Sequence, residues 1–142
     1  MNPLQRILRN AFVRLHAALY RASNGRVGGH LAGLEVLLLT TTGRRSGMRR
    51  TIPLGHIREG EAYVVIASNG GQDQHPAWYL NLRGDPHAQI RLGARTFDVV
   101  AEPARGEQRA RLWARVIAAG PRYAGYATAT TREIPLVLLT PA

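Results

Sequence analysis

The residues best suited to ligand binding gather in one short stretch of the chain, 42–50. It reads Thr-Gly-Arg-Arg-Ser-Gly-Met-Arg-Arg and follows an apolar run that ends in threonines. Backbone amides beside glycines, together with arginine side chains, bind phosphate and carboxylate groups well. The stretch lacks the Gly-Lys-Ser/Thr ending of a Walker A loop. It therefore predicts an anion-binding turn between two strands, and a solvated, charged hairpin remains the alternative.

Three further stretches carry residue types that could contact a ligand. Residues 67–71 read Ala-Ser-Asn-Gly-Gly, and the glycines would let the backbone approach a ligand closely. Residues 75–82 place a tryptophan, a tyrosine and an asparagine in a segment typical of a short helix. Tyr123 and Tyr126 are three positions apart, so on one helical face both phenols could border a ring-shaped substrate. For each stretch, ordinary packing is the competing interpretation.

The composition limits the chemistry open to this chain. It has 142 residues, a net charge of +10 and 19 basic residues, all of them arginine. Such a charge favours anionic partners: a phosphorylated cofactor, a membrane surface or nucleic acid. The absence of cysteine excludes disulfides and thiol nucleophiles. The histidines show no metal-binding spacing and the acidic residues are scattered, so neither a metal site nor a paired-carboxylate hydrolase is expected. An enzyme of this composition would need a cofactor to carry its chemistry.

Residues 3–22 are predicted to form an amphipathic helix. Apolar side chains recur at three- and four-residue spacing, at positions 4, 7, 8, 11, 12, 15 and 19, with arginines between them. Such a helix either packs on the domain or lies on an anionic membrane surface. Arginines interrupt any signal-peptide core, and no apolar run approaches the about 20 residues of a membrane span. We therefore expect a cytoplasmic protein, with peripheral membrane contact through residues 3–22 left open.

The rest of the chain, 25–142, is expected to form one domain, preceded by the helical segment 1–24. A glycine-rich loop at 25–33 links the two. Extended segments are predicted at 35–41, 48–58, 62–68, 89–92, 95–100 and 134–139, and helices at 75–82 and 107–119. Pro53 in the second segment indicates an edge position or a bulge. Short hairpins join most strands, so we predict a mainly β, α+β fold: about six largely antiparallel strands in a small barrel or sheet, with surrounding helices.

Four stretches occur in the order seen in one known family. The runs Leu-Leu-Thr-Thr-Thr-Gly-Arg-Arg-Ser-Gly-x-x-Arg-x-x-Pro-Leu (38–54), Ala-Ser-Asn-Gly-Gly (67–71), His-Pro-Ala-Trp-Tyr-Leu-Asn-Leu (75–82) and Arg-Glu-Ile-Pro-Leu-Val (132–137) resemble the deazaflavin-dependent nitroreductase family, group B of the flavin/deazaflavin oxidoreductases. The resemblance covers about residues 20–141. It implies a split β-barrel related to FMN-binding and pyridoxamine-phosphate-oxidase-like barrels. It also implies coenzyme F-420, a deazaflavin, as hydride carrier.

The resemblance assigns roles to residues of this chain. The family's basic turn binds the phosphate and glutamyl tail of the coenzyme, the loop at 67–71 lies beside the deazaflavin ring, and two tyrosines border the substrate pocket. The cofactor-binding positions implied are Thr42, Gly43, Arg44, Arg45, Ser46, Gly47, Arg50, Pro53, Ala67, Ser68, Asn69, Gly70, Trp78, Tyr79 and Asn81. The catalytic positions implied are Ser68, Tyr123 and Tyr126. Asn69 replaces a lysine common in the family, which implies one charged contact fewer to the cofactor. Gly55 and His56 replace an aromatic, which implies a wider or differently polar substrate pocket.

The expected activity is hydride transfer from the reduced deazaflavin to an electron-poor small molecule: a quinone, a nitro compound or an activated enone. Positioning of the cofactor ring would supply most of the catalysis, with Tyr126 or water as the proton source. Two alternatives stay open, a protein that binds the deazaflavin without turnover and FMN as the true ligand. Nucleic-acid binding is not expected, because the arginines lie in a turn and on one helix without a recognition fold. A homodimer is compatible with the sequence.

Overall fold

The basic turn joins two of the longest strands in the computed structural model, which describes residues 2–142. Strand β2 (Leu34–Thr42) carries the apolar run, and β3 (Arg49–Glu59) leaves the turn antiparallel to it, with Leu38 opposite Pro53. Threonine and the other β-branched residues of these strands favour extended pairing. The two strands therefore hold the predicted anion-binding turn at one end of a hairpin.

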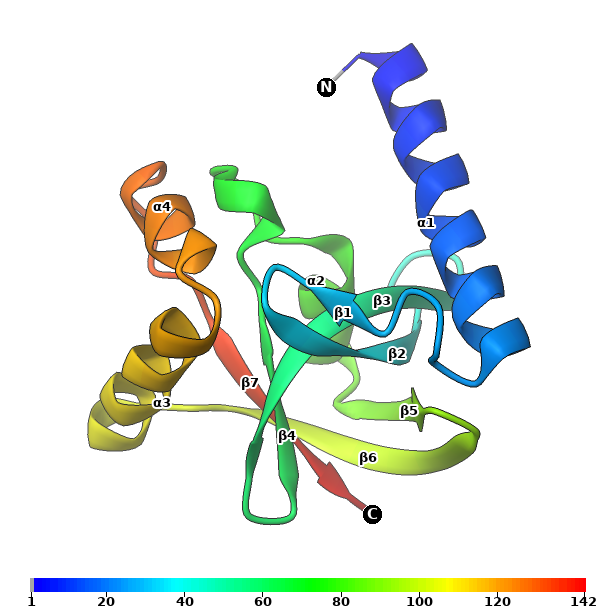
Figure 1. Cartoon of the computed structure of the whole chain (residues 1–142). Helices are drawn as coiled ribbons and strands as arrows, with labels where there is room; N and C mark the ends of the chain where they lie inside the picture. The colour runs from blue at the N-terminus through cyan, green and yellow to red at the C-terminus, as the bar shows by residue number, and fades with distance from the viewer. Residues whose placement is uncertain (1) are drawn as a thin grey trace.

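Six strands close into a barrel (Figure 1). After β3 come β4 (Ala62–Ile66), β5 (His87–Leu92), β6 (Arg95–Pro103) and β7 (Leu136–Pro141). Neighbouring strands follow the order β2-β3-β4-β7-β6-β5, all antiparallel, and β5 pairs again with β2. The expected number and direction of strands are thus confirmed. The loop predicted at 25–33 is wrong in part, because it contains a two-residue strand, β1 (His30–Leu31), that pairs with the start of β2.

The barrel is split along part of β3. Residues 49–55 of this strand pair with β2 only, whereas β4 pairs with residues 56–59. Pro53 has no amide hydrogen to donate, so it is tolerated where one side of the strand lacks a partner. Its predicted edge position is confirmed. Side chains on this open side of β3 are free to line a cleft.

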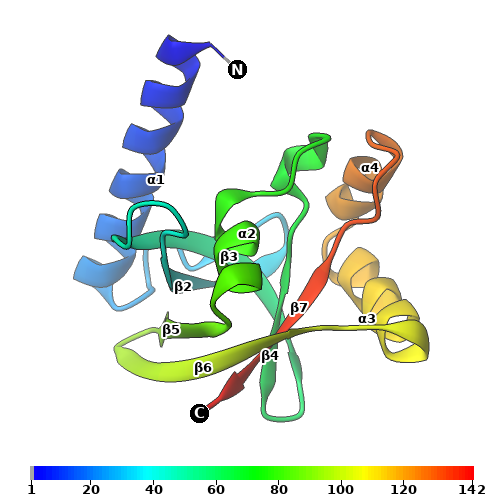
Figure 2. The ribbon, with the colours of Figure 1, turned by 180° about the vertical axis from the view of Figure 1, so that it is seen from behind.

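Apolar side chains fill the barrel and a second layer outside it. One cluster occupies the interior, and another lies between the strands and two helices, α3 (Gly106–Ala119) and α4 (Arg122–Thr128). These helices cover one flank of the barrel (Figure 2). Leu112 and Val116, within the predicted helix 107–119, are fully buried. Every residue of β4 is buried, because successive side chains enter the two clusters in turn.

Two short elements connect β4 to β5, the 3-10 turn η1 (Asn69–Gly71) and helix α2 (Ala77–Gly84). Pro76 precedes the first turn of α2, where a missing amide hydrogen costs little. β4 ends at Ile66, two residues before its predicted end, and the chain then leads into η1. α2 packs on β2 beside the basic turn, so three predicted ligand-binding stretches lie near the split of the barrel.

Helix α1 (Pro3–Ser23) is present as predicted, but it does not pack through the apolar residues that predicted it. Its buried side chains are Ala17 and Tyr20. Between 44% and 66% of the surface is exposed for Leu4, Ile7, Leu8, Phe12, Leu15 and Leu19. The helix therefore turns its small and polar face to the barrel, the reverse of the usual amphipathic arrangement. No helix among residues 2–142 is long and apolar enough to cross a bilayer.

Candidate cofactor site

The basic turn between β2 and β3 is closed by short backbone hydrogen bonds. The Gly43 amide donates to the Met48 carbonyl (2.7 Å), and the Gly47 amide donates to the Gly43 carbonyl (2.9 Å). The Ser46 hydroxyl accepts from the Met48 amide (3.1 Å). A Cβ at Gly43 would lie 2.7 Å from the Ser46 oxygen, so a side chain there would displace the serine. The turn thus projects its arginines from a well-defined backbone.

Asn81 of α2 holds this turn against the barrel. Its side-chain nitrogen donates to the Thr41 hydroxyl (3.0 Å), and its oxygen accepts from the Arg44 amide (3.1 Å) and guanidinium (3.3 Å). Thr41 and Asn81 are both buried, where polar groups need such partners. The structure therefore gives Asn81, predicted as a ligand contact, a positioning role in the wall of the site.

A cavity of about 670 Å³, which we call the basic cavity, opens beside the turn. Its arginines are Arg44, Arg45 and Arg50 from the turn and β3, and Arg6 and Arg9 from α1. The ion pairs found among residues 2–142 lie elsewhere, on α3, so no carboxylate of the described chain neutralises these five guanidinium groups. Like charges in one cavity repel, and a ligand with several negative charges relieves that repulsion.

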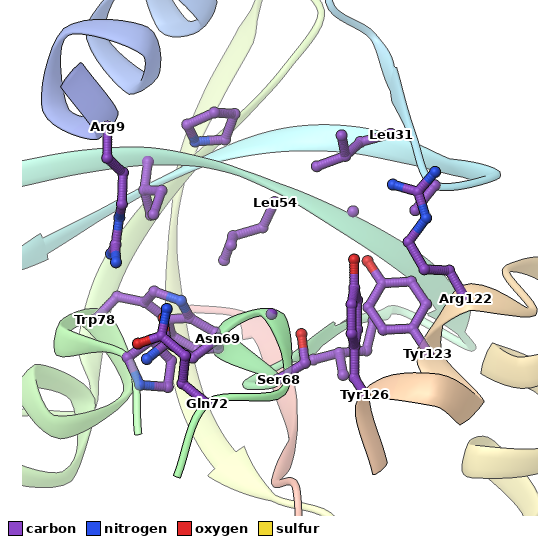
Figure 3. Close-up of a pocket in the computed structure, with 17 residues that line it drawn as sticks. Arg9, Leu31, Leu54, Ser68, Asn69, Gln72, Trp78, Arg122, Tyr123 and Tyr126 are labelled. Carbon is purple, nitrogen blue, oxygen red and sulfur yellow. The ribbon is translucent and has the colours of Figure 1, made fainter. Parts of the chain in front are cut away.

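A second cavity, of about 330 Å³, lies between β3, η1, α2 and α4 (Figure 3). We call it the aromatic cavity, because Trp78, Tyr123 and Tyr126 line it together with the polar groups of Ser68 and Asn69. The residues shared with the basic cavity are Arg9, Ile52, Pro76 and Trp78. The two cavities therefore adjoin. Together they offer a charged compartment and an aromatic compartment to a single ligand.

Arg132 holds the loop after β4, and sequence reasoning missed it as part of the site. Its guanidinium donates to the carbonyls of Ala67 (3.2 and 3.3 Å), Ser68 (2.9 Å) and Gln72 (2.9 Å). These bonds place the Ser68 side chain, which is buried, in the wall of the aromatic cavity. The run at 132–137 belonged to the family pattern. However, the residues next to Arg132 in the sequence do not indicate whether it binds loop carbonyls or lies free on the surface.

The same loop packs tightly on α4. Gly71 has a φ of +82°, and a Cβ there would lie 3.2 Å from the Cα of Tyr126, so a side chain would push the loop and helix apart. Gly70 has a φ of +64°, but a Cβ there would meet nothing within 4 Å. Asn69 is also left-handed (φ +48°), and its side chain donates to the Gln74 carbonyl (3.0 Å). The missing side chain of Gly70 therefore leaves open space at the cavity, whereas that of Gly71 allows the loop to pack closely on α4.

Tyr123 and Tyr126 lie side by side on α4, as their spacing predicted. Their rings are perpendicular, with centroids 5.5 Å apart, and both hydroxyls point the same way (Figure 3). Burial, together with Tyr126, raises the pKa of Tyr123 above its usual value. A Cβ at Gly55 would lie 3.3 Å from the Tyr123 hydroxyl and 3.0 Å from the Cβ of Leu34. Leu34 and the Tyr123 hydroxyl thus take up the space that a side chain at position 55 would need.

His56, the second departure from the family pattern, does not line either cavity. Successive strand residues point to opposite faces, so Gly55 borders the aromatic cavity and His56 does not. The imidazole packs edge-on against Tyr63, with centroids 5.7 Å apart. Burial lowers its pKa, and its Nδ1 has no hydrogen-bond partner among residues 2–142. The expectation that His56 changes the polarity of the substrate pocket is therefore wrong.

Most of the predicted site residues come together in the structure. The cavities are lined by Gly43, Arg44, Arg45, Ser46, Arg50, Pro53, Ser68, Asn69, Gly70, Trp78, Asn81, Tyr123 and Tyr126. Those that line neither are Thr42, Gly47, Ala67 and Tyr79. Thr41 faces the site in place of Thr42, because strand residues alternate. Tyr79 lies on the other side of α2, with its ring 4.8 Å from that of His75.

Sequence reasoning also missed the contribution of α1 to the site. The lining residues from this helix are Arg6, Arg9, Asn10 and Val13. The arginines between the apolar positions were the available signal. Only the tertiary structure shows that this polar face, and not the apolar one, turns toward the basic turn.

Known proteins share both the sequence and the fold of this chain. The family model described as F420H(2)-dependent quinone reductase matches residues 12–141. An F420H(2)-dependent quinone reductase of Mycobacterium tuberculosis is 40% identical over 141 residues, which span 96% of this chain and 95% of the relative. The solved structure of an F420-H2 dependent reductase (FDR-A) has a TM-score of 0.67 and 37% identity, and covers 73% of this chain and 92% of that one. A structure described as a domain-swapped dimer has a TM-score of 0.70 and 30% identity over 97% of this chain and 99% of that one.

The matched residues include the basic turn, the loop after β4 and the tyrosines of α4. The predicted split β-barrel is confirmed by this likeness. The prediction of an oxidoreductase that depends on the deazaflavin coenzyme is confirmed at the level of the family. The chain belongs to the F420H(2)-dependent quinone reductase family.

Proposed function

We propose that this chain reduces quinone-type acceptors with reduced coenzyme F-420. The coenzyme's tail would occupy the basic cavity and its ring the aromatic cavity. The observation that carries the proposal is the shared wall of Arg9, Ile52, Pro76 and Trp78. Because the cavities adjoin, one molecule with a polyanionic end and a flat, conjugated end reaches both.

The basic cavity suits the tail of this coenzyme, which carries a phosphate and glutamyl carboxylates. Arg44, Arg45 and Arg50 offer planar forks to such groups from a closed turn. Each charge-assisted contact is worth about 1.5–3 kcal/mol, and less where water screens it. FMN ends in a single phosphate and would leave much of the positive charge uncompensated. The charge of the cavity therefore favours the deazaflavin over FMN.

The aromatic cavity suits the ring and the acceptor. When bound, the coenzyme supplies a hydride from its deazaflavin ring. The chain contributes the surfaces that align ring and acceptor: Trp78 on the shared wall, the loop at Ser68 and Gly70, and the tyrosines of α4. The open space at Gly70 lets a flat ligand lie against the backbone.

Reduction of a quinone by a hydride also requires a proton on oxygen. Tyr123 lines the aromatic cavity, so its hydroxyl can donate a hydrogen bond to the acceptor oxygen and then a proton, which solvent returns to the phenolate. Tyr126, in ring contact with it, forms the adjoining part of the wall. We propose these two phenols as the catalytic pair, with Ser68 as a contact to the ring.

Anaerobic oxidation of the reduced coenzyme tests this function. A panel of a naphthoquinone, a nitro-aromatic and an activated enone is offered at equal concentration, and the recovery of cofactor absorbance is followed. We expect the quinone to give the highest kcat/KM. Coenzyme binding without turnover on any acceptor would favour the non-catalytic carrier. Tight binding of FMN with no binding of the deazaflavin would overturn the cofactor assignment.

We also propose that α1 contacts a membrane surface. Its apolar face is exposed and flanked by Arg14 and Arg21, an arrangement typical of helices on anionic lipid. Co-sedimentation with vesicles of anionic or neutral lipid, comparing the parent with a Leu8→Ser, Phe12→Ser variant, tests this contact.

A homodimer covering the same face is the alternative, which the likeness to a domain-swapped dimer supports. Sedimentation velocity of the same variant separates the two.

A further inference from the structure

The polar face of α1 closes one side of the basic cavity. Arg6, Asn10 and Val13 line this cavity, and Arg9 lines both cavities. Figure 3 shows the Arg9 side chain extending from α1 toward Trp78. An α-helix turns about 100° per residue, so Arg6 and Leu8 lie on opposite faces of α1. The helix can therefore present arginines to a ligand while its apolar face stays outside.

The attachment of α1 to the barrel is concentrated at its C-terminal end. Ala17 and Tyr20 pack on Val36 and Leu38 of β2. The Tyr20 hydroxyl also accepts from the Gly93 amide (2.8 Å) at the β5–β6 hairpin. The N-terminal half has no residue buried to this degree, and it projects above the barrel (Figure 1). This half meets the rest of the chain across the basic cavity.

The charges on that half lack a partner within the described chain. Neither Arg6 nor Arg9 takes part in the ion pairs or side-chain hydrogen bonds found among residues 2–142. Both face the basic turn across a cavity of about 670 Å³. Without a ligand, the two groups of arginines repel each other, and a polyanion between them would attract both.

We propose that Arg6 and Arg9 determine specificity for a cofactor with a polyanionic tail, by binding the tail from the side opposite the basic turn. The tail then secures the N-terminal half of α1 over the site. The inference rests on the proposed function, but it concerns residues outside the basic turn and loop that the family pattern assigns. The proposal predicts a difference between two ligands. The complete coenzyme contacts Arg6 and Arg9 of α1, whereas the same deazaflavin without phosphate and glutamyl groups does not.

Fluorescence titration of the full chain with both ligands tests this inference. The Arg6→Gln, Arg9→Gln variant should bind the complete coenzyme about tenfold more weakly than the parent and should bind the tail-less deazaflavin equally well. The matched control is Arg14→Gln, Arg21→Gln, which removes the same charge from the same helix at residues that line neither cavity. The control should bind both ligands like the parent.

Hydrogen exchange provides a readout that does not depend on affinity or activity. The complete coenzyme should slow exchange of amides 4–13 in the parent and the control but not in the Arg6→Gln, Arg9→Gln variant at saturation. Parent-like affinity and protection in that variant would overturn the inference, as would an equal loss of affinity for both ligands or in the control. A parent chain that binds neither deazaflavin would overturn the proposed function, and this inference with it.

Discussion

The two cavities of this site are built in different ways. The basic cavity takes three of its arginines from the contiguous stretch 44–50, whereas the aromatic cavity combines residues of β3, the loop after β4, α2 and α4, which are far apart in the sequence. A charged turn keeps its charges together through the local chain. The aromatic cavity exists only once the barrel has closed and α4 has docked. We therefore expect cofactor affinity and turnover to depend on separable parts of the molecule.

Each cavity also has its own positioning residue. Asn81 connects the basic turn to β2, and Arg132 connects the loop after β4 to the segment that precedes β7. The two residues act on backbone groups of opposite kind, an amide in the turn and carbonyls in the loop. Substitutions in one half should therefore change one property of the enzyme and spare the other.

The largest effect is expected from removal of the turn's charge. An Arg45→Ala, Arg50→Ala variant should bind the coenzyme about a hundredfold more weakly, because two charge-assisted contacts are lost, while it remains folded. Fluorescence titration and thermal unfolding measure the two properties. Arg49→Ala is the matched control, since Arg49 is on the same strand but lines neither cavity. Equal weakening in the control would show that only net charge matters and would break the division between the cavities.

The tyrosine pair gives the complementary test. A Tyr123→Phe, Tyr126→Phe variant should lose about tenfold to a hundredfold in kcat with a quinone, since general-acid catalysis contributes on this order or more. Coenzyme affinity should stay within about twofold of the parent, because the aromatic rings are retained and only the hydroxyls are removed. Steady-state kinetics with a cofactor titration separates these quantities. An unchanged kcat would show that the two hydroxyls do not donate the proton, and water would then be the proton source.

Replacement of Arg132 should affect both stability and turnover. Arg132→Gln loses hydrogen bonds to the Ala67, Ser68 and Gln72 carbonyls, and we expect a fall of about 2 kcal/mol in the free energy of unfolding. The displaced loop should lower kcat more than it weakens binding of the coenzyme tail. Urea unfolding and kinetics check this, with Arg26→Gln as an exposed control. A variant that loses tail affinity instead would show that the two halves are coupled.

Replacement of Asn81 should act on the basic side. Asn81→Leu leaves the Thr41 hydroxyl and the Arg44 amide without their partner, at a cost of about 1–2 kcal/mol in stability. The loosened turn should weaken coenzyme binding several-fold, whereas binding of the tail-less deazaflavin stays the same. Titration with both ligands measures the difference. Equal losses for the two would instead assign Asn81 to the ring.

The smallest effect is expected from pH, through the buried His56. Burial lowers its pKa in the folded state, whereas the unfolded chain titrates near the ordinary value of about 6.5. As pH falls through that value, the unfolded state takes up a proton that the folded state does not, so stability falls below about pH 6.5 and is fully present above it. In thermal unfolding between pH 5 and 8, the His56→Leu variant should show a smaller decrease in Tm at low pH than the parent. Cofactor affinity at neutral pH should not change, because His56 lines neither cavity.

Much of the fold followed from local patterns. The helices at 107–119 and 75–82, the hairpins and the edge position of Pro53 were all predicted, because strand and helix periodicity and proline geometry act over a few residues. β1 was missed because a two-residue strand has no periodicity of its own. The ends of β4 and β7 shifted by two residues, since the sheet pairing decides where a strand stops.

The sequence by itself determined the chemistry of the basic turn, because glycines, a serine and arginines adjacent in the chain remain adjacent in any fold. It also supplied the residues of the aromatic cavity and, through their order, the family. Only the tertiary structure decided that Thr41 and not Thr42 faces the site, that Leu34 and Tyr123 take up the space at Gly55, and that α1 turns Arg9 inward. Each of these features depends on which segments, distant in the sequence, come into contact. Along a strand, moving by one residue also turns the side chain to the opposite face of the sheet.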